Sequence, residues 1–268
     1  MPKSPLFTVL VVVSILTGMG IWLFLLPGGG KGPIVANQVA AKPYVEKKES
    51  PSSVATLTID SQVRANGVLF KKLVADAQSK MAEHAKYAAE TWTLMGPSSQ
   101  RQLGLEIDWR VAYESDRVIS LDKSTYDNGG GAHPNFYLNS LLWDKQQEKT
   151  ISLADLFTDS SENSAALKML SANLFGQWET EFKEKSNSAV IDGYALEWAQ
   201  KALAPKVANF ESFVLIAKKG AEGAPATGLT FQYSPYKLSA YVFGSFSFDV
   251  PSSALRPYLA DEWKDQFE

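Results

Sequence analysis

The chain has 268 residues, of which 45% are hydrophobic, 12% aromatic and 21% charged, with a formal net charge of −3. This composition is typical of a globular protein and excludes a disordered, collagenous or nucleic-acid-coating chain. Cysteine is absent, which excludes a disulfide framework, a thiol nucleophile and a thiolate metal site.

The first feature along the chain is an apolar segment, residues 6–26, which contains no charged side chain. As a helix it would be about 31 Å long, close to the hydrocarbon thickness of a bilayer. A cleaved signal peptide is the alternative, but its apolar core would be shorter and its cleavage site nearer. We therefore expect one transmembrane helix in the cytoplasmic membrane. A large C-terminal part behind a very short N-terminal tail is the layout of a signal anchor, so we expect the C-terminal domain to be extracytoplasmic.

The sequence divides into three parts: an N-terminal membrane anchor over residues 1–30, a flexible tether over 31–57 and a folded domain over 58–268. Glycines, prolines and mixed charges predict the tether. Beyond residue 50 the chain has 21 basic and 27 acidic side chains, a net charge of −6. The partners of the domain are therefore expected to be neutral or basic, and nucleic acid is not expected among them.

Helical and strand periodicities follow one another at the start of the folded domain. Apolar residues at helical spacing predict a long amphipathic helix between residues 66 and 91. Over residues 103–114 apolar and polar side chains alternate, which predicts a strand with one face on the core. Residues 117–121 and 136–143 are its expected neighbours in an antiparallel meander, because the connections are too short for crossover helices.

A helical part comes next. Ser152 and Asp155 have the spacing of a capping box that opens a short helical turn. Residues 163–185 predict a helix, and residues 189–203 predict another, which Pro205 ends.

The last part of the chain predicts three strands, over residues 213–217, 229–233 and 242–250. Strand runs separated by a pair of helices indicate an α+β fold. We expect an antiparallel or mixed sheet packed against several helices, preceded by one N-terminal transmembrane helix.

Candidate catalytic residues are few, because the chain has only two histidines. His84 is expected to be a solvated side chain of the long helix. His133 lies in a glycine-rich loop over residues 127–135, for which two interpretations stay open. The loop positions Asp127 and His133 as an acid/base pair or as ligand contacts, or it is a tight connection in which His133 hydrogen-bonds the backbone. We assign no catalytic residue, no metal site and no cofactor.

Aromatic side chains form a second candidate surface. Tyr233, Tyr236, Tyr241 and Phe243 surround a Ser-Pro pair, and tyrosine is enriched where proteins bind other proteins. The alternative is an aromatic edge of the core. The candidate binding residues from both segments are Asp127, His133, Asn135, Tyr233, Tyr236 and Tyr241.

Two segments resemble a known bacterial family. Residues 130–135 read Gly-Gly-Ala-His-Pro-Asn, and residues 151–157 read Ile-Ser-Leu-Ala-Asp-Leu-Phe. Residues 231–241 read Phe-Gln-Tyr-Ser-Pro-Tyr-Lys-Leu-Ser-Ala-Tyr, ahead of a strand that ends in Val-Pro. These motifs are similar to those of an extracytoplasmic domain family found in the lysozyme-binding part of the anti-sigma factor RsiV and in the non-catalytic N-terminal region of the peptidoglycan deacetylase PdaC. The resemblance covers about residues 61–259.

The resemblance implies a membrane-anchored binding module of the cell envelope without catalytic activity. Its expected partner is a lysozyme-like protein or a peptidoglycan fragment, with the bilayer contacted through residues 6–26. Only residues 1–5 precede the apolar segment, and no deacetylase motif follows the domain, so we expect neither sigma-factor binding nor deacetylation. Lys237 stands where the family usually has an acid. The alternative is a glycan-acting cell-wall enzyme, or an accessory subunit, that uses the Asp127/His133 loop.

Overall fold

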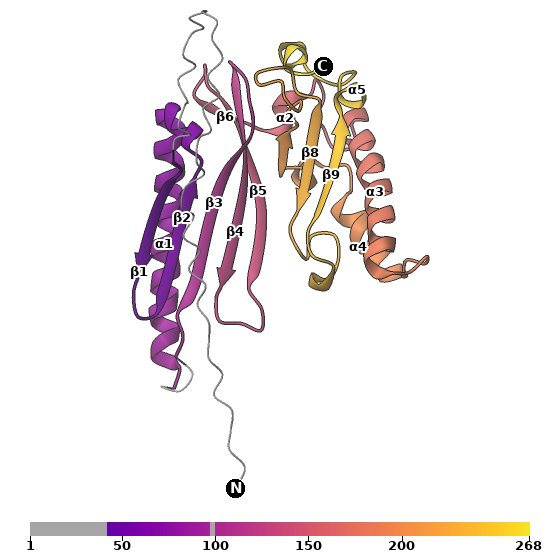
Figure 1. Ribbon diagram of the computed structural model, residues 1–268. Helices are drawn as coiled ribbons and strands as arrows, with labels where there is room; N and C mark the ends of the chain where they lie inside the picture. The colour runs from indigo at the N-terminus through magenta and orange to yellow at the C-terminus, as the bar shows by residue number, and fades with distance from the viewer. Residues whose placement is uncertain (1–41, 97–99) are drawn as a thin grey trace, which may run out of the picture. The chain divides into compact units, whose positions relative to one another are not determined.

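The computed structural model describes residues 42–96 and 100–268. The predicted anchor and its apolar segment, residues 6–26, lie outside the described residues. The helices and strands in chain order are β1 (Tyr44–Glu49), β2 (Ser53–Ile59), α1 (Gly67–Leu94), β3 (Leu103–Glu114), β4 (Val118–Asn128), β5 (Asn135–Asp144), β6 (Lys149–Ile151), α2 (Leu153–Leu156), α3 (Ala165–Ser186), α4 (Gly193–Ala202), β7 (Phe213–Leu215), β8 (Gly228–Tyr233), β9 (Phe246–Pro251) and α5 (Ser252–Leu255) (Figure 1). The fold is α+β, as predicted.

Six strands form a mixed sheet in the order β1-β2-β3-β4-β5-β6. β2 and β3 pair in parallel, and α1 is the crossover helix that such a pair requires. All other neighbours in this sheet are antiparallel. The predicted meander of β3, β4 and β5 is therefore confirmed, and it continues into β6.

The prediction of a flexible tether up to residue 57 is wrong for its second half. Residues 44–59 form β1 and β2, and the side chains of Ala55, Leu57 and Ile59 are fully buried. Their alternation with Val54, Thr56 and Thr58 is the two-residue period of a strand with one face on the core. β1 was hidden because it is an edge strand rich in charged residues, a pattern that protects sheet edges from aggregation. Lys47, Lys48 and Glu49 face solvent, whereas Glu46 accepts hydrogen bonds from Gln78 of α1.

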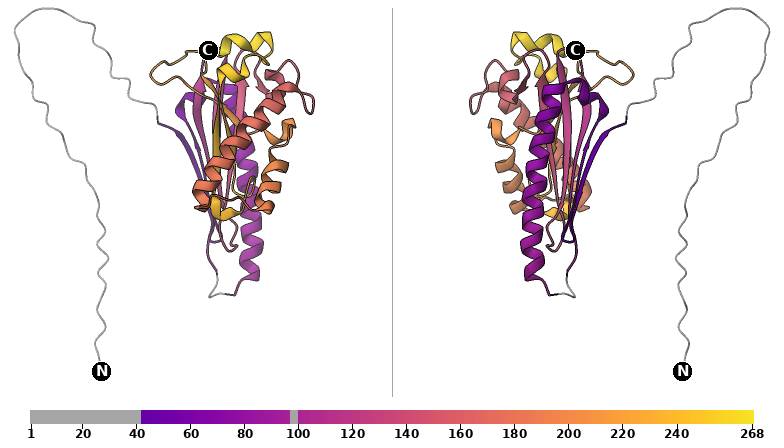
Figure 2. Two further views of the ribbon diagram at one scale, coloured as in Figure 1. Left: turned by 90° about the vertical axis from the view of Figure 1, so that its right-hand side faces the viewer. Right: turned by 90° about the vertical axis from the view of Figure 1, so that its left-hand side faces the viewer.

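α1 covers one face of the six-stranded sheet (Figure 2). The helix predicted between residues 66 and 91 is confirmed, and so is the strand predicted over residues 103–114. Burial of each large aliphatic side chain in this layer contributes about 1.5–3 kcal/mol. The buried side chains between helix and sheet include Leu69, Leu73, Ala77 and Met81 of α1, Leu105, Ile107 and Trp109 of β3, and Ile119 and Leu121 of β4.

The other face of this sheet packs against a second, three-stranded antiparallel sheet in the order β7-β8-β9, and α3 packs on β9. The helix predicted over residues 163–185 is α3, which buries Leu170, Leu174 and Trp178. β9 begins at Phe246, four residues later than predicted, because residues 241–243 form a 3-10 turn that ends at Gly244 with a φ of 70°.

Two serines join the sheets. β7 is an edge strand of the small sheet, and its Phe213 N–H donates to Ser140 Oγ at 2.7 Å. Two residues further on, Leu215 N–H donates to Ser120 Oγ at 3.1 Å. Ser120 is completely buried. A buried N–H group without an acceptor costs about 1–3 kcal/mol, so these hydroxyls allow a strand edge to lie on the face of another sheet.

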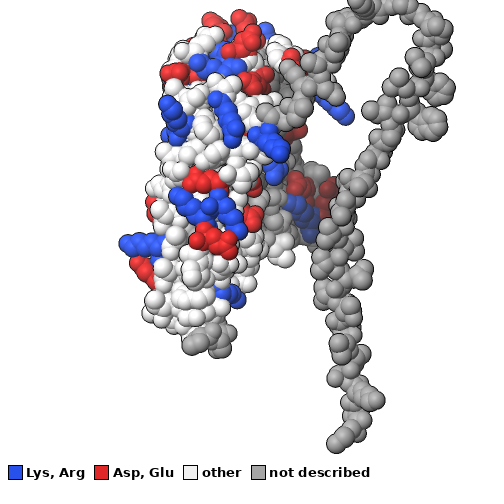
Figure 3. All heavy atoms as spheres, turned by 60° about the vertical axis from the view of Figure 1, so that its left-hand side comes forward, with Lys and Arg blue, Asp and Glu red and all other residues white. Residues whose placement is uncertain are grey.

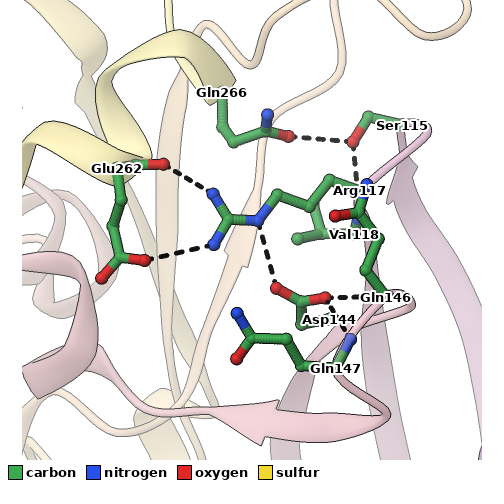
Figure 4. Close-up of polar contacts among 8 residues, drawn as sticks. All are labelled: Ser115, Arg117, Val118, Asp144, Gln146, Gln147, Glu262 and Gln266. Carbon is green, nitrogen blue, oxygen red and sulfur yellow. Dashed lines mark hydrogen bonds and ion pairs between the residues drawn. The ribbon is translucent and has the colours of Figure 1, made fainter.

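A buried ion pair fixes the C-terminal end to the large sheet (Figure 4). Arg117, in the turn between β3 and β4, donates through Nε to Asp144 Oδ2 at 3.1 Å and through Nη1 to the carbonyl of Glu262 at 2.6 Å. Its guanidinium also lies 3.9 Å from the centre of the Trp263 ring. Residues distant in the sequence therefore meet at one cation.

The Asp144 carboxylate at the centre of this contact is completely buried. Burial alone would raise its pKa, but the backbone N–H groups of Gln147 and Gln146 and the Arg117 guanidinium together hold the pKa below its usual value. Stability from this carboxylate is therefore fully present above the unfolded-state pKa of about 3.9. It is lost as the pH falls through the lower pKa of the folded protein.

We expect Arg117→Met to lower the free energy of unfolding at neutral pH by about 3 kcal/mol, because Asp144 keeps its charge but loses its cation. The difference from the unchanged protein should shrink at acidic pH, because without the guanidinium the pKa of Asp144 is higher in the variant, whose Asp144 therefore takes up its proton at a higher pH than Asp144 of the unchanged protein. Denaturant unfolding at pH 7 and pH 3 measures both values. Equal differences at the two pH values would contradict the assignment of the effect to this ion pair.

Candidate functional site

The loop between β4 and β5 is held tightly by its glycines. Gly130 has a φ of 84°, and a Cβ atom at this position would lie 3.1 Å from Leu103 Cδ2. Its N–H donates to Asn128 Oδ1 at 3.3 Å, and its carbonyl accepts from Arg101 at 3.0 Å. Only glycine fits both the left-handed backbone and this close approach. The loop therefore has a fixed place against the start of β3.

Asp127, at the end of β4, faces α1 and not His133. Its Oδ1 lies 3.6 Å from Nδ1 of His84. The prediction that His84 is solvated is wrong: the ring is buried, and its Nε2 has no hydrogen-bond partner among the described residues. Helical spacing places His84 three residues after Met81, on the buried stripe of α1. The structure thus assigns Asp127 to a helix–sheet contact.

His133 forms an exposed cluster with two tyrosines of the other sequence segment. Its ring stacks on Tyr241, with centroids 3.8 Å apart and an interplanar angle of 20°. Its Nδ1 lies 3.0 Å from the carbonyl of Pro134, which can only accept, so Nδ1 carries the proton in the neutral ring. Nε2 then accepts from the Tyr236 hydroxyl at 3.3 Å. We call His133, Tyr236 and Tyr241 the aromatic cluster.

The cluster is held by hydrogen bonds from both segments. The Tyr241 hydroxyl donates to the carbonyl of Pro134 at 2.8 Å. Ser234, which begins the turn before Tyr236, accepts from Leu138 N–H of β5 at 2.8 Å. These contacts attach the turn after β8 to β5 and to the loop that precedes it.

Tyr236 has the most unusual backbone in the cluster. Its φ is 69°, in the left-handed region that a bulky side chain rarely adopts. Such a conformation costs on the order of 1–3 kcal/mol and is concentrated at functional sites. The side chain is nevertheless 51% exposed, so its packing does little to offset the strain of the backbone.

The structure brings three of the six candidate residues into contact. His133, Tyr236 and Tyr241 meet in the aromatic cluster. Asn135 is the first residue of β5 and pairs with Asp127 in the sheet register. Tyr233 is buried at 6% exposure, and burial raises the pKa of its hydroxyl. The acid/base interpretation of the loop required contact between Asp127 and His133, and their side chains have other partners.

A groove of about 970 Å³, which we call the side groove, lies beside the turn after β8. It runs between α4, the outer edge of β5 and the end of β8. The sequence analysis missed it because its walls come from four separate segments. Its lining residues are Tyr137, Leu138, Asn139 and Ser140, then Tyr194, Glu197, Trp198, Lys201 and Ala202, then Ala208, Asn209, Glu211 and Ser212, and finally Gln232, Tyr233, Ser234 and Lys237.

In the part of the chain that the structure describes, we find no further candidate site formed by surface charges or by metal-ligating side chains. Basic and acidic side chains are interspersed on the face seen in Figure 3. This face therefore carries no extended basic surface for a phosphate-rich partner. Within residues 42–96 and 100–268, no group of histidines and carboxylates is arranged to hold a metal ion. Over the same residues no helix has the length and apolarity to cross a membrane.

We expect Gly130→Ala to lower the free energy of unfolding by about 1–2 kcal/mol, because the new Cβ atom meets Leu103 and the positive φ becomes strained. Gly131→Ala is the matched control, since the nearest atom to its Cβ lies at 3.9 Å. Thermal unfolding of both variants measures the difference. Equal stability of the two variants would show that the loop accommodates a Cβ atom at residue 130 without strain.

Comparisons with known proteins support the fold. No family model matches the sequence, and no curated protein matches it. A DUF3298 family member from Bacteroides fragilis has a similar structure, with a TM-score of 0.53 and 16% identity over 82% of this chain and 92% of that chain. A DUF3298 family protein from Pseudomonas aeruginosa is also similar, with a TM-score of 0.52 and 13% identity over 84% of this chain and 95% of that chain. The chain therefore has a fold similar to that of DUF3298 family proteins.

Proposed function

We propose that this protein is a membrane-anchored binding module of the bacterial cell envelope, and that its aromatic cluster recognises a lysozyme-like protein. The proposal rests on the two motifs that resemble the RsiV and PdaC domain family. They lie about a hundred residues apart in the sequence, and His133 of the first stacks on Tyr241 of the second. Motif residues that served only local turns would have no reason to meet on an exposed surface.

Tyr236 is the observation that carries the proposal. A φ of 69° at an exposed tyrosine raises the free energy of the folded state. Tyrosine supplies a large contact area and a hydroxyl with little loss of side-chain entropy, which is why it is enriched among the residues that dominate interface energetics. Binding energy from a partner would account for the retention of this residue in a strained position.

Binding is favoured over catalysis by the partners of His133. Both ring nitrogens of His133 are occupied, one by a carbonyl and one by the Tyr236 hydroxyl. Asp127, the carboxylate expected to act with it, lies against His84. A general acid or base needs to reach the substrate proton within hydrogen-bond distance, and this ring is engaged within the protein.

The charge of the chain is suited to a basic partner. Beyond residue 50 the net charge is −6, which attracts a partner of net positive charge. A charge of this size acts mainly on the rate of association and on its dependence on salt. Affinity is therefore assigned to the aromatic cluster, and the net charge to the approach of the partner.

The proposed anchor is the apolar segment over residues 6–26, with the folded domain outside the cytoplasm. We expect alkaline phosphatase fused after Glu268 to be active, because this enzyme folds only after export. Deletion of residues 6–26 is the control and should abolish that activity. A fusion that is inactive as a phosphatase, together with an active cytoplasmic reporter at the same position, would reverse the proposed topology.

We expect Tyr236→Gly to weaken binding of lysozyme by about 1–3 kcal/mol, the range of an interface anchor. The substitution should not lower the melting temperature, because glycine adopts a φ of 69° without strain. Calorimetry with the full-length chain in detergent measures the affinity, and thermal unfolding measures the stability.

Tyr194→Ala is the matched control for this experiment. Tyr194 is also exposed, at 74%, but it lies on α4 outside the aromatic cluster. Its loss should leave lysozyme binding unchanged. Absence of a complex between the unchanged protein and lysozyme at high micromolar concentration would refute the choice of partner, and unfolding of Tyr236→Gly would mark the tyrosine as a structural residue.

A further inference from the structure

We propose that the side groove is a binding site for a neutral oligosaccharide. The inference goes beyond the proposed function, because it concerns other residues and another class of ligand. Four observations carry it: the aromatic walls, the buried polar atoms without partners, the balance of charge, and the state of the β5 edge.

The walls of the groove present aromatic rings to solvent. Tyr194 is 74% exposed and Tyr137 is 44% exposed, from α4 and from β5 respectively. Trp198 lies one turn after Tyr194, with ring centroids 5.8 Å apart and planes at 76°. Exposed aromatic groups around a concave surface are typical of ligand sites. A sugar ring offers flat faces of C–H groups, which pack on aromatic rings, and a rim of hydroxyl groups.

Polar atoms in the lining are buried without partners. Gln232 Oε1 and the Tyr233 hydroxyl have no hydrogen bond to any described residue, and both residues line the groove. Each such atom costs about 1–3 kcal/mol when it is left unpaired. Gln232 Oε1 needs a donor, and the Tyr233 hydroxyl can donate or accept. Consecutive side chains of a strand point to opposite faces, and Tyr233 packs in the core against Phe248, so Gln232 Oε1 is the atom that we assign to the ligand. A sugar hydroxyl group supplies the donor that this oxygen lacks.

The charges around the groove cancel. Its lining contains two carboxylates, Glu197 and Glu211, and two ammonium groups, Lys201 and Lys237. None of the four belongs to an ion pair within the described residues. Glu197 and Lys201 stand four residues apart on α4, a spacing at which Glu179 and Lys183 do pair. A site with no net charge favours a neutral ligand, and free carboxylates can bind hydroxyl groups.

The edge of β5 argues against an extended peptide as the ligand. A peptide that adds a strand needs free N–H and C=O groups along the edge. Leu138 N–H donates to Ser234 Oγ at 2.8 Å, and the Leu138 carbonyl accepts from the Ser212 and Ser234 hydroxyls at 3.4 Å. This position in the middle of the groove is closed to strand addition. The ligand is then recognised by side chains, as an oligosaccharide is.

Saturation-transfer NMR on the full-length chain tests the proposal, in a detergent that carries no sugar head group. The probes are chitotetraose, cellotetraose and maltotetraose, with the peptide Ala-Glu-Lys-Ala as a comparison. We expect ring protons of at least one tetrasaccharide to receive magnetisation, with a dissociation constant of about 1 mM or tighter. No transfer to any tetrasaccharide, or transfer to the peptide alone, overturns the proposal.

Gln232→Met separates a binding role from a structural one. Methionine keeps the approximate shape and removes the unpaired Oε1, so the melting temperature should not fall, while the affinity for the tetrasaccharide should fall at least tenfold. Tyr194→Ala should weaken the same binding about fivefold. Tyr87→Ala is the control, because Tyr87 is an exposed tyrosine of α1 that does not line the groove, and it should leave this affinity unchanged. Unchanged affinity in both Gln232→Met and Tyr194→Ala overturns the proposal, whatever the result with lysozyme.

Discussion

The contact between the two sheets is the constraint on which the rest of the structure depends. β7 lays a strand edge against the large sheet, where the N–H group of Leu215 is buried and that of Phe213 is partly buried. Ser140 and Ser120 supply the acceptors that this edge needs, and hydroxyl groups on neighbouring strands are small enough to leave the surrounding core closely packed. The small sheet and its helices are thereby fixed relative to the large sheet.

Both candidate sites are consequences of that contact. The aromatic cluster joins the loop before β5 to the turn after β8, and the side groove is bounded by β5, β8 and α4. Neither exists on one sheet alone. Sites between two packed layers gain rigidity from both, and Ser234, which bonds to Leu138 between the two sites, belongs to this same contact.

Local patterns predicted the elements better than their assembly. The alternation over residues 103–114 and the apolar stripe of α1 each require one buried face, so β3 and α1 could be predicted from spacing alone. β1 could not, because an edge strand of lysines and glutamates has the composition of a tether. The arrangement as two sheets could not either, because the acceptors for β7 are serines whose role appears only in three dimensions.

The sequence predicted some residues of the candidate sites and missed others. His133, Tyr236 and Tyr241 belong to motifs that can be recognised in one dimension, and the structure places them together. His84 was misassigned because its polarity outweighed its position three residues after the buried Met81. Tyr194 and Trp198 could not be recognised as site residues from the sequence. Exposed aromatic residues on a helix line a groove only together with the residues opposite them, which here belong to β5 and β8.

The ion pair of Arg117 has a consequence for how the chain folds during synthesis. Arg117 lies in the turn between β3 and β4 of the large sheet, yet its partners include Glu262, 145 residues later in the chain. Contacts between residues so far apart form late, because the entropy of closing a long loop opposes them. Arg117 can pair with Asp144 as soon as the large sheet forms, whereas its contacts with the Glu262 carbonyl and the Trp263 ring form only after these residues have left the ribosome. The large sheet can therefore assemble first, and the C-terminal segment docks on Arg117 in a separate, later step of folding.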